Sequence, residues 1–188
     1  QVFLSVGPHD RPPRRYRSRD YVWWLGVLGK WKTKTPDPKT EHVTIAVSGS
    51  HGGQTVDFRR FAQRGITLLG LTKKFKDGFL CFANDLKENI EQGDNNYLSV
   101  LDKADDYVAR NNFDLPEEPE ARIIESDPEC ITNPILELNL DKTNIRSIIW
   151  ATGYTQDFSW LKVDTFDTSG NPHHNRGVSE KNGIYFIG

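Results

Sequence analysis

The sequence predicts an α/β fold, and three observations lead to this prediction. Residues 2–6 are apolar except for Ser5, as in a parallel strand covered on both faces. Residues 43–69 follow the pattern strand, glycine-rich turn, helix, strand. Two further apolar runs, 145–150 and 183–187, read as strands that lead into glycine-containing turns. With 188 residues, 36% of them hydrophobic, the chain has enough apolar material for one domain, or for one domain and part of another.

The charge and the cysteine content argue against several classes of protein. A net charge of -2 is too small to attract a polyanion over a distance, so we expect no nucleic-acid partner. Cys81 and Cys130 are far apart and form no CxxC motif, so we expect neither a disulfide framework nor a metal site, and a reducing cytoplasmic location. No apolar run approaches the length of about 20 residues that spans a bilayer.

The two ends of the chain predict a segment of a longer protein. The sequence contains no methionine, begins within an apolar run and ends at Gly188, directly after a predicted strand. We therefore expect any activity to belong to a parent chain.

A basic loop follows the first predicted strand. Five arginines lie within residues 11–19, and the prolines among them are incompatible with a regular helix or a central strand. A solvated surface loop is one interpretation. A phosphate clamp is another, because dinucleotide folds place ribose-phosphate contacts after a strand end and arginine binds phosphate through two nitrogens. A nucleic-acid patch is the third and weakest, because no basic surface with interleaved aromatic residues continues beyond Tyr16.

The next stretches predict a short aromatic helix and then a βαβ-like unit. Residues 21–29 are mostly apolar and need burial, either by plain packing or as a lid over a substrate pocket. Within 43–69, Thr55 is the expected N-cap of the helix and Gly65 its end. The turn at 48–53, SGSHGG, is either a tight turn or a ligand-facing loop, since glycine amides before a helix can bind anions. It matches neither GxGxxG nor the P-loop pattern.

The middle of the chain predicts a hairpin and helices. Asp77-Gly78 is a typical hairpin turn. A helical pattern then covers about 85–112, and residues 92–96, QGDNN, are expected to break it into two helices. Acidic residues at 102, 105 and 106 are expected to face solvent. Residues 115–120 predict an extended acidic linker and the best internal boundary.

Residues 145–154 form the most informative stretch. An apolar strand pattern runs into Ala151, Thr152, Gly153 and Tyr154, a small-residue turn. Because Gly153 has no Cβ, the backbone could approach another group closely there. Together with 183–188, the stretch suggests strand ends that deliver backbone to a ligand.

At this point the chain resembles a known family. The segments PRRYRSRD at 13–20, HGGQTVDFRR at 51–60, GITLLG at 65–70 and DFSWLKVD at 157–164 occur in that order, together with ATGY at 151–154. This set resembles the flavin-containing monooxygenase-like oxidoreductases, and in particular a bacterial flavoprotein branch of that family. The resemblance covers essentially the whole chain.

The resemblance implies an enzyme with two dinucleotide-binding domains and the cofactors FAD and NADPH. Residues 1–150 would be an incomplete Rossmann-like NADPH-binding domain with a helical insertion at about 85–112. Residues 151–188 would be the interdomain crossing and the start of the returning FAD-binding domain. In such an enzyme NADPH reduces bound FAD, for monooxygenation of a small-molecule substrate. A non-catalytic binding module that contacts an anionic partner through residues 11–19 is the alternative.

The resemblance also implies cofactor-binding residues. The 2′-phosphate of NADPH would be selected at the end of the first strand by Ser5, His9, Arg11 and Arg14, although many relatives carry arginine where this chain has Gly7. The ATGY residues named above would lie at the domain crossing, and Gly188 would approach FAD. Both GxGxxG fingerprints would lie upstream, so the isolated chain is expected to bind little flavin and to be inactive. The cofactor carries the chemistry, so no acid–base residues are expected; Asp157, His173 and His174 are expected to be structural.

Overall fold

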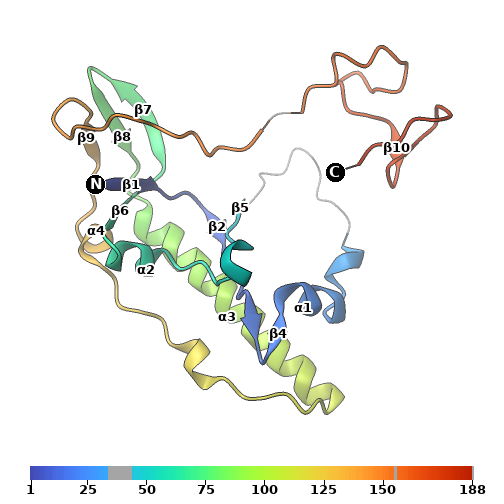
Figure 1. The fold of residues 1–188 in the computed structure, drawn as a ribbon, viewed down its shortest axis with the longest axis horizontal. Helices are drawn as coiled ribbons and strands as arrows, with labels where there is room; N and C mark the ends of the chain where they lie inside the picture. The colour runs from blue at the N-terminus through green and yellow to red at the C-terminus, as the bar shows by residue number, and fades with distance from the viewer. Residues whose placement is uncertain (34–43, 155, 188) are drawn as a thin grey trace. The chain divides into compact units, whose positions relative to one another are not determined.

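The computed structural model describes residues 1–33, 44–154 and 156–187, which form two compact units (Figure 1). The first unit spans Gln1–Ile145 and the second Arg146–Gly188. The chain is mixed α/β with small sheets, so the predicted class is correct at that level.

Two parallel strand pairs organise the first unit. β1 (Val2–Ser5) pairs with β6 (Ile66–Leu69), and β2 (His9–Asp10) pairs with β5 (Thr44–Ile45). The strands predicted at 2–6 and 66–69 are therefore confirmed. The predicted strand at 43–47 is seen only as β5, and residue 43 lies outside the described residues. Because β5 pairs with β2 and not with β6, the predicted βαβ-like unit does not form within one sheet.

Antiparallel strands form two further sheets in this unit. Two residues with positive φ, Asp77 (51°) and Gly78 (81°), form the predicted turn between two of them, as a hairpin with right-handed twist favours. The other short hairpin turns at Arg17 and Ser18. The antiparallel strands are β3 (Arg15–Tyr16), β4 (Arg19–Asp20), β7 (Thr72–Lys76), β8 (Phe79–Phe82) and β9 (Glu137–Asn139), the last three in the order β7-β8-β9.

The described residues of this unit also form four α-helices and three short 3-10 turns. The helices are α1 (Tyr21–Val27), α2 (Phe58–Gln63), α3 (Leu86–Asn111) and α4 (Glu129–Thr132), and the turns are η1 (Lys30–Lys32), η2 (Ser50–Gly52) and η3 (Pro119–Arg122). The predicted aromatic helix is α1, whose Trp24 is fully buried and donates from Nε1 to the Tyr16 carbonyl at 3.0 Å. The cap of α2 is Asp57 rather than Thr55, since the Asp57 carboxylate accepts from the Arg59 backbone N–H.

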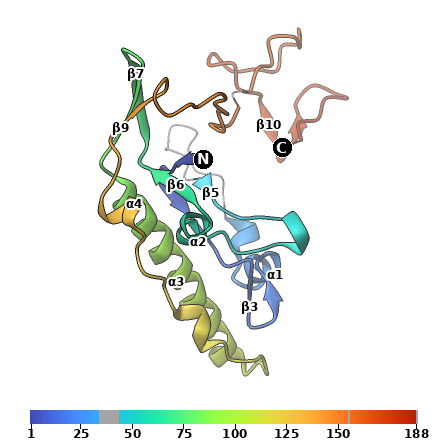
Figure 2. The same ribbon diagram turned by 60° about the vertical axis from the view of Figure 1, so that its left-hand side comes forward.

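The helix α3 is continuous, so the predicted break at 92–96 is wrong. Figures 1 and 2 both show α3 extending through the first unit. A Cβ at Gly93 would lie 2.5 Å from Nε2 of His9, so the glycine lets β2 approach the helix backbone. Asp94 is buried and paired with Arg11. Gly93 and Asp94 belong to the stretch that was predicted to break the helix. In the structure they are instead residues through which α3 packs against β2 and the basic loop.

Two apolar clusters lie along α3. Near its N-terminus, Leu86 and Ile90 pack with Val6, Leu68 and Ile131. The second cluster lies nearer the C-terminus of α3 and comprises Tyr16, Trp24, Leu101, Ala104 and Val108. A third cluster involves β6, β8 and β9 and comprises Leu69, Phe82 and Leu138. Asp94 falls between the first two clusters along α3, so a charged layer separates them.

The predicted acidic linker at 115–120 is part of the first unit, which contradicts its assignment as a boundary. Glu118 accepts from the Ser18 backbone N–H at 3.0 Å, and Tyr97 donates to the Ala121 carbonyl at 2.8 Å. Arg122 pairs with Asp105 at 2.5 Å. Asp102 and Asp106 are exposed as predicted, but Asp105 is only partly exposed, because Arg17 of the basic loop and Arg122 of η3 pair with it.

The second unit contains little regular structure. A hairpin joins β10 (His174–Asn175) to β11 (Val178–Ser179), and Tyr185 forms a single bridge to Val178. Phenylalanines 158, 166 and 186 pack together with ring centroids 5.7–6.1 Å apart. The strands predicted at 145–150 and 183–187 are not formed in the described residues. A strand needs a neighbour to satisfy its backbone, and Ile149 and Trp150 are instead 89% and 66% exposed.

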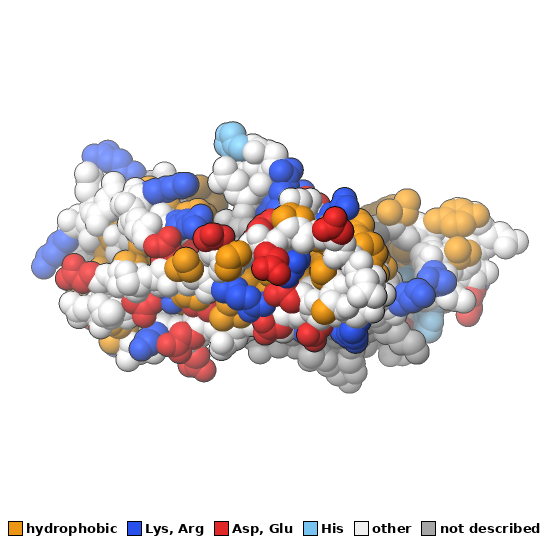
Figure 3. Space-filling view, turned by 90° about the horizontal axis from the view of Figure 1, so that it is seen from below, with side chains coloured by type: hydrophobic (Ala, Val, Ile, Leu, Met, Phe, Trp, Pro, Cys, Tyr) orange, Lys and Arg blue, Asp and Glu red, His pale blue; other side chains and the backbone are white. Residues whose placement is uncertain are grey.

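The surface carries charges of both signs. On the face drawn in Figure 3, basic and acidic side chains lie next to one another, with no large patch of one sign. In the described part of the chain, none of the helices combines the length and the hydrophobicity needed to cross a membrane.

Candidate functional site

The first predicted cofactor residue, Ser5, stands at the end of β1. Its hydroxyl donates to the Gly70 carbonyl at 2.9 Å and accepts from the Thr72 backbone N–H at 3.1 Å. The Thr72 hydroxyl lies 3.0 Å away as well. The Ser5 hydroxyl therefore fastens β1 to the segment that joins β6 to β7.

His9 is buried at the start of β2, with 3% of its surface exposed. Its Nδ1 lies 3.0 Å from the Gly7 carbonyl, which can only accept, so Nδ1 carries the proton. Its Nε2 has no hydrogen-bond partner among the described residues and faces Gly93. The ring packs edge-on against Phe58 with centroids 4.7 Å apart. Burial lowers the pKa of His9, so the neutral form is favoured.

Arg11 is the centre of a buried charge cluster. Its Nε and Nη2 donate to Oδ1 of Asp94 at 3.0 and 2.6 Å. Its guanidinium carbon lies 4.5 Å from the centroid of the Tyr97 ring, a cation–π contact. Asp57 lies 3.9 Å from Nη1. Only 5% of the Arg11 side chain is exposed, so in this structure it binds residues of α3 and is not accessible to an external phosphate.

Arg59 on α2 completes the cluster. Its Nη1 lies 2.8 Å from Oδ2 of Asp94, and its Nε donates to Asp127 at 2.8 Å. Burial alone would lower the pKa of Arg59, but the carboxylates of Asp94 and Asp127 outweigh it and raise the pKa. We define the buried charge cluster as Arg11, Asp57, Arg59, Asp94 and Asp127. Of these five residues, Arg11 was predicted to bind a cofactor and the other four were not.

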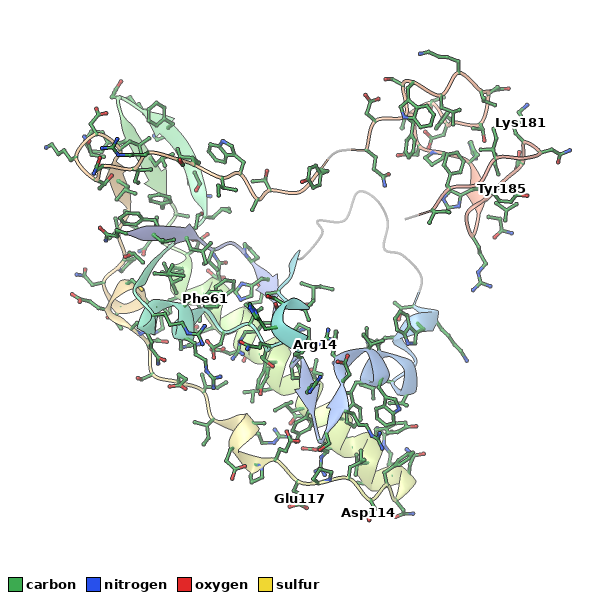
Figure 4. All side chains as sticks on the ribbon, viewed as in Figure 1. Arg14, Phe61, Asp114, Glu117, Lys181 and Tyr185 are labelled. Carbon is green, nitrogen blue, oxygen red and sulfur yellow. The ribbon has the colours of Figure 1, made fainter. Side chains whose placement is uncertain are left out.

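Arg14 differs from Arg11 because about a quarter of its side chain (24%) is exposed. Its Nη2 pairs with Asp20 at 2.9 Å, and its backbone N–H donates to the Thr55 hydroxyl at 2.9 Å. A Cβ at Gly53 would clash with Nε of Arg14, the residue labelled in Figure 4, so the glycine-rich turn lies directly against this side chain. The turn at 48–53 therefore faces the basic loop.

The far end of the basic loop also binds carboxylates. Arg17 and Tyr16 both donate to Asp105, and so does Arg122 of η3. Burial would raise the pKa of Asp105, but the hydrogen bonds from Arg122, Arg17 and Tyr16 lower it. Arg19 lies over the Trp23 ring at 5.3 Å. None of these internal partners was predicted from the sequence.

The second group of predicted cofactor residues belongs to the second unit. Residues 151–154 are exposed, and Tyr154 is fully so. Gly153 adopts φ +83°, a backbone conformation that favours glycine, and no described atom lies within 4 Å of a Cβ built there. Gly188 lies outside the described residues. The cofactor roles of these residues stay predictions.

A cavity of about 450 Å³ in the second unit is lined by the histidines that were expected to be structural. His174 accepts from the Gly177 backbone N–H at 3.0 Å and packs at 5.7 Å from the Phe186 ring. Asp157 accepts from the Ser159 backbone N–H at 2.8 Å. His174 and Asp157 thus each hold a turn of the backbone.

Comparison with known proteins relates the chain to oxidoreductases. Over 45 residues it is 42% identical to the uncharacterized oxidoreductase CzcO-like of Geobacillus kaustophilus. These 45 residues are 23% of this chain and 13% of that protein. Over 57 residues it is 37% identical to the uncharacterized oxidoreductase CzcO of Bacillus velezensis and of Bacillus subtilis, or 30% of this chain and 16% of each. The matched part is thus well under a fifth of the length of these relatives. No family model matches the chain, and no solved structure matches it significantly.

Proposed function

We propose that the chain is part of an FAD- and NADPH-dependent oxidoreductase in which NADPH reduces bound FAD for monooxygenation of a small molecule. The similarity to three curated oxidoreductases carries this proposal. The ordered motif set, with ATGY at 151–154, supports the flavin-dependent class.

The parallel pair β1–β6 is compatible with an incomplete Rossmann-like domain. In open α/β sheets ligands bind beyond the carboxyl ends of parallel strands, and here the basic loop follows that end of β1. Ser5, His9 and Arg11 fit a direct 2′-phosphate contact poorly, because each is held by internal partners. Arg14 also pairs with Asp20, but about a quarter of its side chain is exposed, so it is the predicted residue that fits best, and we assign the contact to it.

The proposal is tested with a longer protein that includes the chain upstream of residue 1. Purified, it should release FAD on denaturation and oxidise NADPH faster than NADH. Arg14→Ala should reduce the preference for NADPH over NADH, while Arg110→Ala, an exposed arginine on α3, should leave it unchanged. A protein without flavin would refute the proposal, and an unchanged preference in Arg14→Ala would refute the assignment of Arg14 alone.

The alternative of a non-catalytic module that binds an anionic partner receives less support. It requires a free basic loop, whereas Arg11 and Arg17 pair with Asp94 and Asp105.

A further inference from the structure

A second cavity lies beside α2, outside the buried charge cluster except for one shared residue, Asp57. Its volume is about 270 Å³, slightly below the range of roughly 300–1,000 Å³ for ligand pockets, so it suits a small ligand or one end of a larger one. It is lined by Gln54, Thr55, Asp57, Arg60, Phe61 and Arg64.

Two arginines line this cavity: Arg60 lies in α2, and Arg64 is the C-cap residue that follows the helix. Arg60 and Arg64 are four residues apart, the spacing that places side chains side by side on a helix. Both are exposed, whereas the neighbouring Arg59 is buried in the charge cluster. Like charges at this spacing repel each other, and an anion bound between the two arginines would reduce this electrostatic repulsion.

The acidic residues near the cavity do not cancel this charge. Asp57 caps α2 with Oδ1, and its Oδ2 lies 3.9 Å from the Arg11 guanidinium. Glu125 lies 3.8 Å from Arg60, in a pair whose side chains are 60% and 39% exposed. Such an exposed pair is worth only about 0–1 kcal/mol, so a doubly charged anion can displace it.

We propose that this cavity binds the phosphate group of a phosphorylated small molecule. Arg60 and Arg64 hold the phosphate, since guanidinium forks match phosphate oxygens in geometry and charge. Gln54, whose amide can donate hydrogen bonds, also lines the cavity, and the half-buried Phe61 ring, marked on α2 in Figure 4, offers an apolar face to the organic part of the ligand. The proposal does not rest on the flavin chemistry proposed above.

The test is calorimetric titration of the 188-residue chain with inorganic phosphate at low ionic strength. Saturable binding is expected, and the double variant Arg60→Gln/Arg64→Gln should weaken it about tenfold or more, because charge-assisted hydrogen bonds are the strong ones. Glu125→Gln should strengthen binding, since it frees Arg60. Arg110→Gln, an exposed arginine on α3, is the matched control and should bind like the wild type.

Parallel titrations with 2′-AMP and 5′-AMP distinguish the sources of the phosphate. Tightest binding of 2′-AMP would assign the cavity to a nucleotide 2′-phosphate, and equal binding of all three would assign it to another phosphorylated compound; both results support the site. Absence of saturable phosphate binding would overturn the proposal. So would a double variant that melts at a lower temperature but binds phosphate like the wild type, because the arginines would then only stabilise the end of α2.

Discussion

Replacing Asp94 by alanine should destabilise the first unit more than removing any exposed carboxylate does. Asp94 is the acceptor that Arg11 and Arg59 share, and the exposed fractions of the three side chains are 10%, 5% and 5%. Breaking a buried ion pair by removing one partner costs about 3–5 kcal/mol, because a charge stays buried without its partner. Arg59 keeps Asp127, but Arg11 loses both of its close hydrogen bonds and keeps only Asp57 at 3.9 Å. We therefore expect a loss of about 3–5 kcal/mol in the free energy of unfolding.

Urea denaturation followed by far-ultraviolet circular dichroism measures this loss. Asp102→Ala is the matched control on the same helix, because Asp102 pairs with Arg122 at 2.7 Å but its side chain is 63% exposed. An exposed pair of this kind contributes about 0–1 kcal/mol. If Asp94→Ala and Asp102→Ala unfold at the same urea concentration, the inference that the buried charge cluster holds α3 against β2 is wrong.

Three further predictions concern the same unit. Gly93→Ala should destabilise it by about 1 kcal/mol, because overpacking against His9 costs about 1–3 kcal/mol whereas the higher helix propensity of alanine contributes about 1 kcal/mol. In the same urea titration, the control Asn95→Ala, at an exposed position, should be neutral or stabilising. Because burial lowers the pKa of His9 below its unfolded value of about 6.5, the unfolded state takes up the proton first, so the free energy of unfolding should fall as the pH drops below about 6.5. His9→Gln should flatten that part of the profile, and an equal slope in both proteins would contradict this. Trp24→Ala should cost about 3–5 kcal/mol, measured by chemical denaturation, because Trp24 is fully buried and its indole N–H bonds to Tyr16. A loss below about 1 kcal/mol would show that the second apolar cluster does not depend on it.

The sequence predicted correctly those helices, strands and turns whose conformation depends on neighbouring residues in the chain. The strand β6 lies at the predicted residues because a β-branched and apolar run follows Gly65 directly. The hairpin at Asp77-Gly78 is set by two residues that accept positive φ. The helix α1 begins after Asp20, which caps it through the Val22 backbone N–H.

The sequence did not reveal the partners of the basic loop, because those partners are distant in the chain. Arg11 meets Asp94 and Arg17 meets Asp105, 83 and 88 residues away. A signal was present, since Asp94 and Asp105 are eleven residues apart, close to three helical turns, and would face the same side of an unbroken helix. The apparent break at 92–96 concealed it.

The strand predicted at 145–150 failed for a related reason. Residues such as Ile148 and Ile149 favour strands, but a strand forms only where a neighbour accepts its hydrogen bonds. In the described residues this run has no such neighbour, and Ile149 is 89% exposed. Strand propensity therefore predicted a strand here, but the described residues contain no neighbouring strand that pairs with it.

The central proposal is that the chain is part of an oxidoreductase in which NADPH reduces FAD. Anaerobic addition of NADPH to the purified longer protein, followed by visible absorbance, tests this most directly. The account predicts a yellow protein whose flavin absorbance is lost on addition of NADPH, and more slowly with NADH. A colourless protein, or a flavin that NADPH leaves oxidised, would contradict it.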